Sequence, residues 1–254
     1  MRFDILTIFP ALFSSPLEEG ILRRARASGA MSVHLHNIRD AAVDRHKMTD
    51  DRPFGGGEGM VMKADVLASC LHRVREQGPP GPVILLSPRG RRYTHAMARE
   101  LAAEKRLILV CGRYEGVDER FCRRYVDSEI SIGDYVLTGG ELAAMVIVDS
   151  VTRLLPGVLG CADSARKDSF SRGLLKHPQY TRPREFEGMT VPAELLSGDH
   201  ARIREYRFLE SVRVTLERRP ELLAGVEFSR EEMRLLRRSG LADRVERYRT
   251  GHEQ

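Results

Sequence analysis

The chain has 254 residues, of which 42% are hydrophobic and 30% are charged, a balance typical of globular proteins. No apolar run approaches the roughly 20 residues that a membrane-spanning helix needs, and the N-terminal stretch lacks the order of a signal peptide. The net charge of +5 permits a nucleic-acid partner but does not establish one. We therefore expect a cytoplasmic protein, without membrane contact, built from one α/β domain and a smaller domain.

Residues 1 to about 160 alternate between two kinds of pattern, one typical of strands and one typical of helices. Strands are expected at residues 2–9, 32–38, 83–86 and 107–111, and helices at 17–28, 63–77, 93–104 and 140–155. Such an alternation predicts a mostly parallel sheet that is covered by helices on both faces.

The pattern dissolves at residues 158–189, which indicates a long linker or a functional loop. Helical patterns return after this segment. Asp199 is expected to be the N-cap of one helix, and Ser229 with Glu232 is expected to form a capping box at the start of a later one. The sequence thus predicts a domain at 1–160, a linker at 161–190 and a helical domain at 191–254.

Two glycine-rich segments, 107–121 and 131–145, each place an apolar, strand-like run beside glycines, a tyrosine and a carboxylate. Glycine lets the backbone approach a ligand closely, and the polar side chains supply hydrogen bonds, so the pair could enclose one small molecule. Two ordinary strand-to-helix turns are the alternative. The chain lacks both the G-x-G-x-x-G motif of dinucleotide sites and the Walker A phosphate loop.

The four cysteines, Cys70, Cys111, Cys122 and Cys161, have no zinc-site spacing among themselves or with histidines. We expect them to be buried free thiols. No carboxylate cluster suggests a dedicated metal site, and the sequence does not indicate whether a divalent ion assists the protein.

Seven segments, in this order, carry a family resemblance: RPFGGGEGM, LILVCGRYEGVDER, SIGDYVLTGGEL, PGVLG, KDSF, HPQYTRP and LLSGDH. Together they closely resemble the bacterial tRNA (guanine-N1)-methyltransferases, which methylate the guanosine on the 3′ side of the anticodon. The resemblance implies a SPOUT-type α/β fold with a deep trefoil knot between Val83 and Met145, followed by a small all-helical domain that binds tRNA. The pattern alone would not predict a knot, because threaded chains are very rare. The resemblance also implies a homodimer with active sites shared between protomers.

The methyl donor that the resemblance implies is S-adenosylmethionine, held by the two glycine-rich segments and by the end of the strand before them. The matched positions are Leu86, Ser87, Pro88, Gly112, Tyr114, Glu115, Gly116, Ser131, Ile132, Gly133, Asp134, Tyr135, Val136, Leu137, Gly139 and Gly140. For the RNA base, the matched positions are Asp50, Arg113, Glu115 and Arg182.

Methylation at guanine N1 requires removal of the N1 proton, so the reaction needs a general base. By resemblance the base is Asp168, and Arg153 stabilises the negative charge that develops on guanine O6. Without the resemblance, Asp168 would be read as a linker aspartate that caps a turn. An exposed aspartate is a weak base, but burial on RNA binding would strengthen it.

Three positions depart from the family pattern. Leu85 stands where relatives often have an aromatic residue, and Ala143 replaces a common proline near the start of a helix. Lys167 precedes Asp168 where an acidic residue is common, and a neighbouring cation opposes the action of a carboxylate as a base.

Two other functions fit the same residues. One is a knotted RNA methyltransferase that acts on ribosomal RNA or on another tRNA base. The other is a non-catalytic RNA-binding protein that responds to S-adenosylmethionine. The pairing of Asp168 with Arg153 argues against the second, because a sensor needs no general base. The sequence does not identify the tRNA isoacceptors.

Overall fold

The computed structural model describes residues 1–160 and 167–249, and the chain divides into compact units at Met1–Ala162 and Asp163–Gln254. Each unit is described by itself. No helix in the described ranges is both long enough and apolar enough to cross a membrane.

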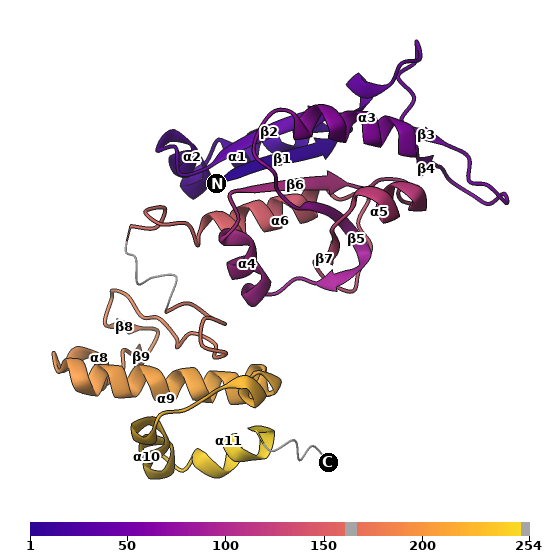
Figure 1. Ribbon diagram of the computed structural model, residues 1–254. Helices are drawn as coiled ribbons and strands as arrows, with labels where there is room; N and C mark the ends of the chain where they lie inside the picture. The colour runs from indigo at the N-terminus through magenta and orange to yellow at the C-terminus, as the bar shows by residue number, and fades with distance from the viewer. Residues whose placement is uncertain (161–166, 250–254) are drawn as a thin grey trace. The chain divides into compact units, whose positions relative to one another are not determined.

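Within the described residues of the first unit, five strands form one parallel sheet in the order β2-β1-β6-β5-β7 (Figure 1). The strands are β1 (Arg2–Thr7), β2 (Ser32–Asn37), β5 (Val83–Arg92), β6 (Arg106–Cys111) and β7 (Ser128–Ser131). The central strand β6 is buried along its whole length, because both of its faces are covered. The predicted α/β fold with a mostly parallel sheet is confirmed.

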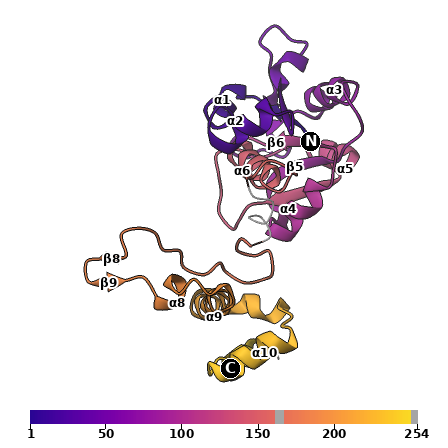
Figure 2. The same ribbon diagram turned by 90° about the vertical axis from the view of Figure 1, so that its left-hand side faces the viewer.

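Helices cover both faces of this sheet (Figure 2). One face carries α1 (Ser14–Leu17), α2 (Gly20–Ala27), α4 (His95–Ala102) and α6 (Glu141–Thr152), and the other carries α3 (Ala64–Arg75) and α5 (Glu119–Tyr125). Short 3-10 turns, η1 (Pro10–Phe13) and η2 (Ile38–Ala41), follow β1 and β2. Alternate residues of the strands face the two helical layers, so the apolar core is split into one cluster on each side.

Several predicted elements differ from those observed. Strand β5 continues to Arg92, and its pairing with β7 shifts register between Leu86 and Arg91. The segment expected to be strand-like after Ser131 is a loop, because β7 ends there and Val136 is exposed. Helix α5 was not predicted, although its N-cap Asp118 accepts a hydrogen bond from the Arg120 amide in the usual way.

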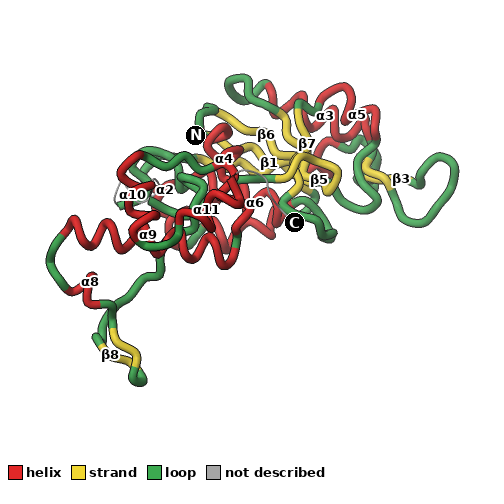
Figure 3. Tube along the Cα trace, turned by 90° about the horizontal axis from the view of Figure 1, so that it is seen from below, coloured by secondary structure: helices red, strands yellow, loops and turns green. Residues whose placement is uncertain are grey.

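A small antiparallel ribbon projects from the first unit beside α3 (Figure 3). It consists of β3 (Asp50–Asp51) and β4 (Val61–Met62), joined by residues 52–60, the β3–β4 loop. The Met62 amide donates to the Gly116 carbonyl at 2.9 Å, and the Glu115 amide donates to the Met60 carbonyl at 2.9 Å. The ribbon is therefore fixed to the loop that follows β6.

The second unit begins with irregular chain and a short ribbon, and then becomes helical. Its elements are β8 (Glu185–Phe186), β9 (Met189–Thr190), α8 (Ala193–Leu196), α9 (His200–Arg218), η3 (Pro220–Gly225), α10 (Arg230–Arg238) and α11 (Ala242–Arg249). Its apolar core centres on Val212, Leu223 and Leu236. The predicted N-cap at Asp199 and the capping box of Ser229 with Glu232 are confirmed.

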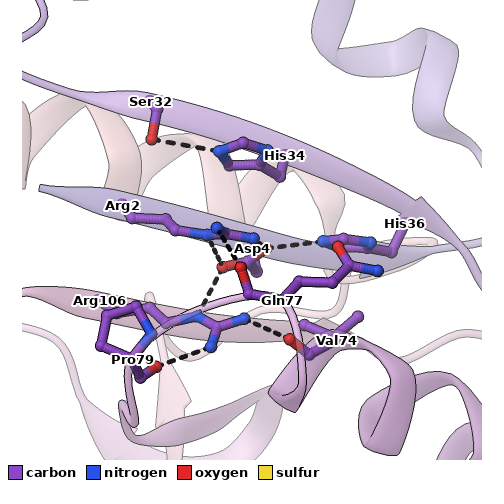
Figure 4. A network of polar contacts seen from close by, with 9 residues as sticks. All are labelled: Arg2, Asp4, Ser32, His34, His36, Val74, Gln77, Pro79 and Arg106. Atoms are coloured by element: carbon purple, nitrogen blue, oxygen red, sulfur yellow. Dashed lines mark hydrogen bonds and ion pairs between the residues drawn. The ribbon is translucent and has the colours of Figure 1, made fainter.

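An ionic network lies at the amino-terminal edge of the sheet (Figure 4). The Asp4 carboxylate, fully buried in β1, accepts hydrogen bonds at 2.7 Å from Arg2 Nε, Arg106 Nε and His36 Nε2. Arg106 is also buried, and it donates to the carbonyls of Val74 and Pro79 at 2.6 and 2.7 Å. Burial by itself raises the pKa of Asp4, but these hydrogen bonds outweigh burial and hold that pKa well below its usual range.

Candidate functional site

A cavity of about 360 Å³ opens at the carboxyl ends of β6 and β7, beside the middle of β5, where the pairing with β7 shifts register. This is the edge at which parallel sheets usually bind ligands. Its walls come from the segments 85–89, 112–117, 130–133 and 135–140, together with Ala143. Backbone amides and carbonyls of the glycine-rich loops therefore lie beside apolar side chains, an arrangement typical of a small-molecule site.

The cavity brings together nearly all the residues that the sequence assigns to the methyl donor. Every one of them lines it except Asp134. Sequence reasoning missed other residues on the walls, which are Arg89, Val117, Ile130 and Thr138, with the two departure positions Leu85 and Ala143. These lie next to assigned positions, so extending each motif by a few residues would have found them.

The chain at Gly139 and Gly140 passes close to the ends of two strands. The Gly140 amide donates to the Gly112 carbonyl at 2.9 Å, and Arg113 and Gly139 form an isolated antiparallel bridge. A methyl group on Gly140 would lie only 2.8 Å from the Cα of Cys111 and 3.0 Å from the Cβ of Leu86. Position 140 therefore requires glycine because no side chain fits there.

This packing predicts that alanine destabilises the fold at Gly140 but not at Gly112. We expect Gly140→Ala to lower the free energy of unfolding by about 1–3 kcal/mol, because the neighbouring backbone must move. At Gly112 the nearest atoms would be 3.6 Å from an added methyl group, so Gly112→Ala should stay within about 0.5 kcal/mol of the wild type. Urea unfolding followed by circular dichroism measures both, and equal losses would contradict the close passage at Gly140.

Arg113 is held at the cavity wall by a network that the sequence did not reveal. Its Nε donates to Glu141 Oε2 at 3.0 Å, and its Nη1 donates to the Thr138 carbonyl at 3.1 Å. The guanidinium lies 4.5 Å from the centre of the Phe9 ring, a cation–π contact. Glu141 is buried at the first turn of α6, and its other oxygen accepts from Thr7 Oγ1 at 2.8 Å.

This network ties the end of β1 and the start of α6 to the loop that lines the cavity. A carboxylate at the start of a mostly apolar helix, whose other acidic residue is Asp149 near its end, was the signal in the sequence that could have pointed to Glu141. Arg113, which the sequence assigned to the RNA base, therefore also fixes Thr138 beside the cavity.

The loop after β6 carries a second unusual feature. Tyr114 has φ of +61°, a conformation that is uncommon for a residue with a side chain and is often found at functional sites. The Glu115 side chain lies against Gly59 of the β3–β4 loop, where an added methyl group would be 2.6 Å from Glu115 Oε1. Asp50 does not line the cavity, but its strand β3 pairs with β4, which is bonded to this loop.

The two proposed catalytic residues occupy different units. Arg153 is the exposed C-cap residue of α6 in the first unit. Asp168 lies in a turn of the second unit, and its carboxylate accepts a hydrogen bond from Lys176 Nζ at 2.8 Å. Lys176 is a cationic partner 8 residues away that the sequence did not predict. Arg182 is exposed and lines a separate cavity of the second unit.

In the part of the chain that the structure describes, no group of three or more histidine, cysteine or acidic residues is placed to hold a metal ion. Cys70, Cys111 and Cys122 are buried free thiols, which confirms the prediction for these residues, whereas Cys161 lies outside the described residues. Burial raises the pKa of Cys70 and of Cys122 to about 11, which keeps both thiols protonated and unreactive.

Comparison with known sequences gives a consistent picture. Residues 1–225 match the profile of the family described as tRNA (Guanine-1)-methyltransferase TrmD. A relative from Geotalea uraniireducens is 56% identical over 93% of this chain and 96% of its own length. Relatives from Geobacter sulfurreducens (55%, over 94% of this chain and 99% of their own) and Chloroflexus aggregans (58%, over 88% of each) are also similar. All three are named tRNA (guanine-N(1)-)-methyltransferase.

Proposed function

This chain belongs to the tRNA (guanine-1)-methyltransferase TrmD family and methylates guanine N1 of tRNA, and we propose that its target is the guanosine that directly follows the anticodon, with S-adenosylmethionine as methyl donor. One observation carries the proposal. The residues that match the family's donor site are scattered over 55 positions from 86 to 140, and all of them except Asp134 line one cavity at the carboxyl edge of the sheet.

The residues present fit S-adenosylmethionine. A cavity of about 360 Å³ lies within the range of roughly 300–1,000 Å³ found for small-molecule sites. The backbone of 112–116 and 132–140 offers donors and acceptors for an adenine edge, and Leu86, Ile132 and Leu137 offer apolar walls. When bound, S-adenosylmethionine supplies an electrophilic methyl group on a sulfonium.

The chain's own residues would handle the proton and the charge of the guanine. In this proposal the Asp168 carboxylate accepts the N1 proton, and the Arg153 guanidinium stabilises the negative charge on O6. Lys176 Nζ donates a hydrogen bond to the Asp168 carboxylate, and in this proposal RNA binding releases the carboxylate from this pair. Glu115 is available to accept a hydrogen bond from the guanine edge, and Asp50 and Arg182 complete the proposed contacts with RNA.

We also propose the deep knot, the division into 1–160, 161–190 and 191–254, and the homodimer that the resemblance implies. The close passage of Gly140 beside Cys111 and Leu86 supports threading of the chain between β5 and β6. The exposed Leu142 and Val146, one turn apart on α6, offer an apolar face to a second copy. Because the substrate is tRNA, the cytoplasm is the compartment that we propose.

A substrate change tests the proposed target. A tRNA transcript with guanosine on the 3′ side of the anticodon is expected to accept a tritiated methyl group from S-adenosylmethionine, and the same transcript with adenosine there is expected to accept none. Methylation of both transcripts would contradict the target and favour another base. Binding of S-adenosylmethionine without transfer to either transcript would favour the non-catalytic sensor.

A further inference from the structure

The second unit contains its own cavity, of about 410 Å³, and among the proposed RNA contacts only Arg182 lines it. The consecutive residues 177–182 and Arg184 form much of its wall, Val191, Leu195 and Leu196 form an apolar part, and α9 contributes Arg207. Neither Asp168 nor Arg153 lines it. The cavity therefore has the mixed lining of a ligand site but is separate from the proposed catalytic residues.

The guanidinium groups at this cavity lack ion-pair partners among the described carboxylates. The structure shows no ion pair between Arg182, Arg184 or Arg207 and a described carboxylate, and no described carboxylate lines the cavity. The acidic side chains nearby already have other partners. Glu194 pairs with Arg202 at 3.7 Å, and Glu210 pairs with Arg213.

The charges around this cavity shift the pKa values of two neighbouring side chains, His177 and Tyr206. Burial, together with Arg207 and Lys176, lowers the pKa of His177. Burial, together with Glu210 and Tyr180, raises the pKa of Tyr206 to about 12. Arg207 and Lys176 thus act on His177, whereas Glu210 and Glu194 act on Tyr206, which is hydrogen-bonded to Tyr180.

An aromatic ring is available beside these cations. Tyr180 is 47% exposed although it lines the cavity. Arginine binds phosphate oxygens through paired N–H groups, and an exposed aromatic ring stacks on a nucleobase. An apolar wall, an exposed tyrosine ring and guanidinium groups without an ion-pair partner among the described carboxylates match a phosphate together with an adjoining unstacked base.

We propose that this cavity binds one unstacked nucleotide of the RNA substrate, other than the target guanosine, with its phosphate on Arg184 and Arg207 and its base on Tyr180. This inference rests on the proposed function for the identity of the polyanion. The cavity then contributes to the choice of RNA, because a base inside a duplex cannot reach the ring.

The test compares four variants of the full chain with the wild type. We measure the Kd for a tRNA transcript at several salt concentrations, and the Kd for S-adenosylmethionine by calorimetry. Tyr180→Ala is expected to weaken RNA binding by about 5- to 150-fold, whereas Tyr180→Phe, which keeps the ring, is expected to stay within about twofold. Arg207→Gln is expected to weaken binding and to reduce the slope of log K against log salt by about 0.7–0.9.

The fourth variant, Arg234→Gln, removes an exposed arginine of α10 that does not line the cavity. It should have a smaller effect than Arg207→Gln, and no variant should change the affinity for S-adenosylmethionine or the thermal midpoint. RNA binding of Tyr180→Ala at the wild-type level, or equal losses for Arg234→Gln and Arg207→Gln, would overturn the inference. A wild type that binds RNA through Tyr180 but transfers no methyl group would contradict the proposed function alone.

Discussion

Replacing Asp168 with asparagine is expected to reduce methyl transfer by about a hundredfold or more and to leave the affinity for S-adenosylmethionine unchanged. Asparagine keeps the size of the side chain but has no carboxylate to accept the N1 proton. The cavity that we propose for the methyl donor lies in the first unit and Asp168 lies in the second, so the variant should not disturb donor binding. Single-turnover transfer of tritiated methyl measures the chemical step, and calorimetry measures donor affinity.

A matched control separates this chemical role from a structural one. Ser169 stabilises the same turn, because its Oγ accepts a hydrogen bond from the Lys176 amide at 2.9 Å. Ser169→Ala should therefore loosen the turn without removing the carboxylate, and its activity should remain within a few-fold of the wild type. If Asp168→Asn keeps wild-type activity, or if both variants lose activity equally, Asp168 is not the general base.

Complementation tests our proposal that the active sites are shared between protomers. Arg153→Ala and Asp168→Ala should each be inactive as pure proteins. If each active site takes Arg153 from one protomer and Asp168 from the other, a heterodimer retains one intact site and regains part of the activity. Absence of recovery in heterodimers verified by mass spectrometry would contradict sharing between protomers.

Apolar periodicity and helix-capping residues in the sequence predicted several helices and strands of this fold. The alternation of apolar patterns predicts β1, β2, β6, α3 and α6 because each of these elements buries one face or both faces in a regular period. Caps such as Asp199 were also predictable, because a cap depends on residues within one helical turn. Strand β7 and helix α5 were missed because both are short, and their apolar residues do not form a full period.

Contacts between distant residues were beyond these rules. Thr7 and Glu141 are 134 positions apart, and nothing local in either segment requires their hydrogen bond. Likewise, the ion pair of Asp168 with Lys176 depends on how the turn folds back, whereas the lysine next to Asp168 in the sequence is Lys167. The family resemblance supplied the donor-cavity residues because it carries information about three-dimensional proximity that periodicity lacks. The cavity around Arg207 had no such motif.

The largest effect on stability is expected from Asp4→Asn, which removes the buried charge that the network in Figure 4 surrounds. The change leaves Arg106, also fully buried, without its carboxylate partner. Breaking a buried ion pair from one side typically costs about 3–5 kcal/mol, so we expect a loss of that size in the free energy of unfolding. Urea unfolding measures it, and the affinity for S-adenosylmethionine should persist because the cavity lies at the opposite edge of the same strands.

The dependence of the free energy of unfolding on pH tests the contribution of Asp4 independently. The pKa of Asp4 is held below its ordinary value of 3.8 in the folded chain, so the ionised carboxylate stabilises the fold above that value and loses this contribution as the pH falls. The difference in stability between the wild type and Asp4→Asn should therefore narrow as the pH is lowered below about 4. Asp40→Asn is the matched control, because its exposed pair with Lys47 should contribute less than about 1 kcal/mol. Equal effects at Asp4 and Asp40 would mean that neither burial nor the additional donors set the strength of the network, since the two carboxylates differ in their exposure to water and in their number of cationic partners.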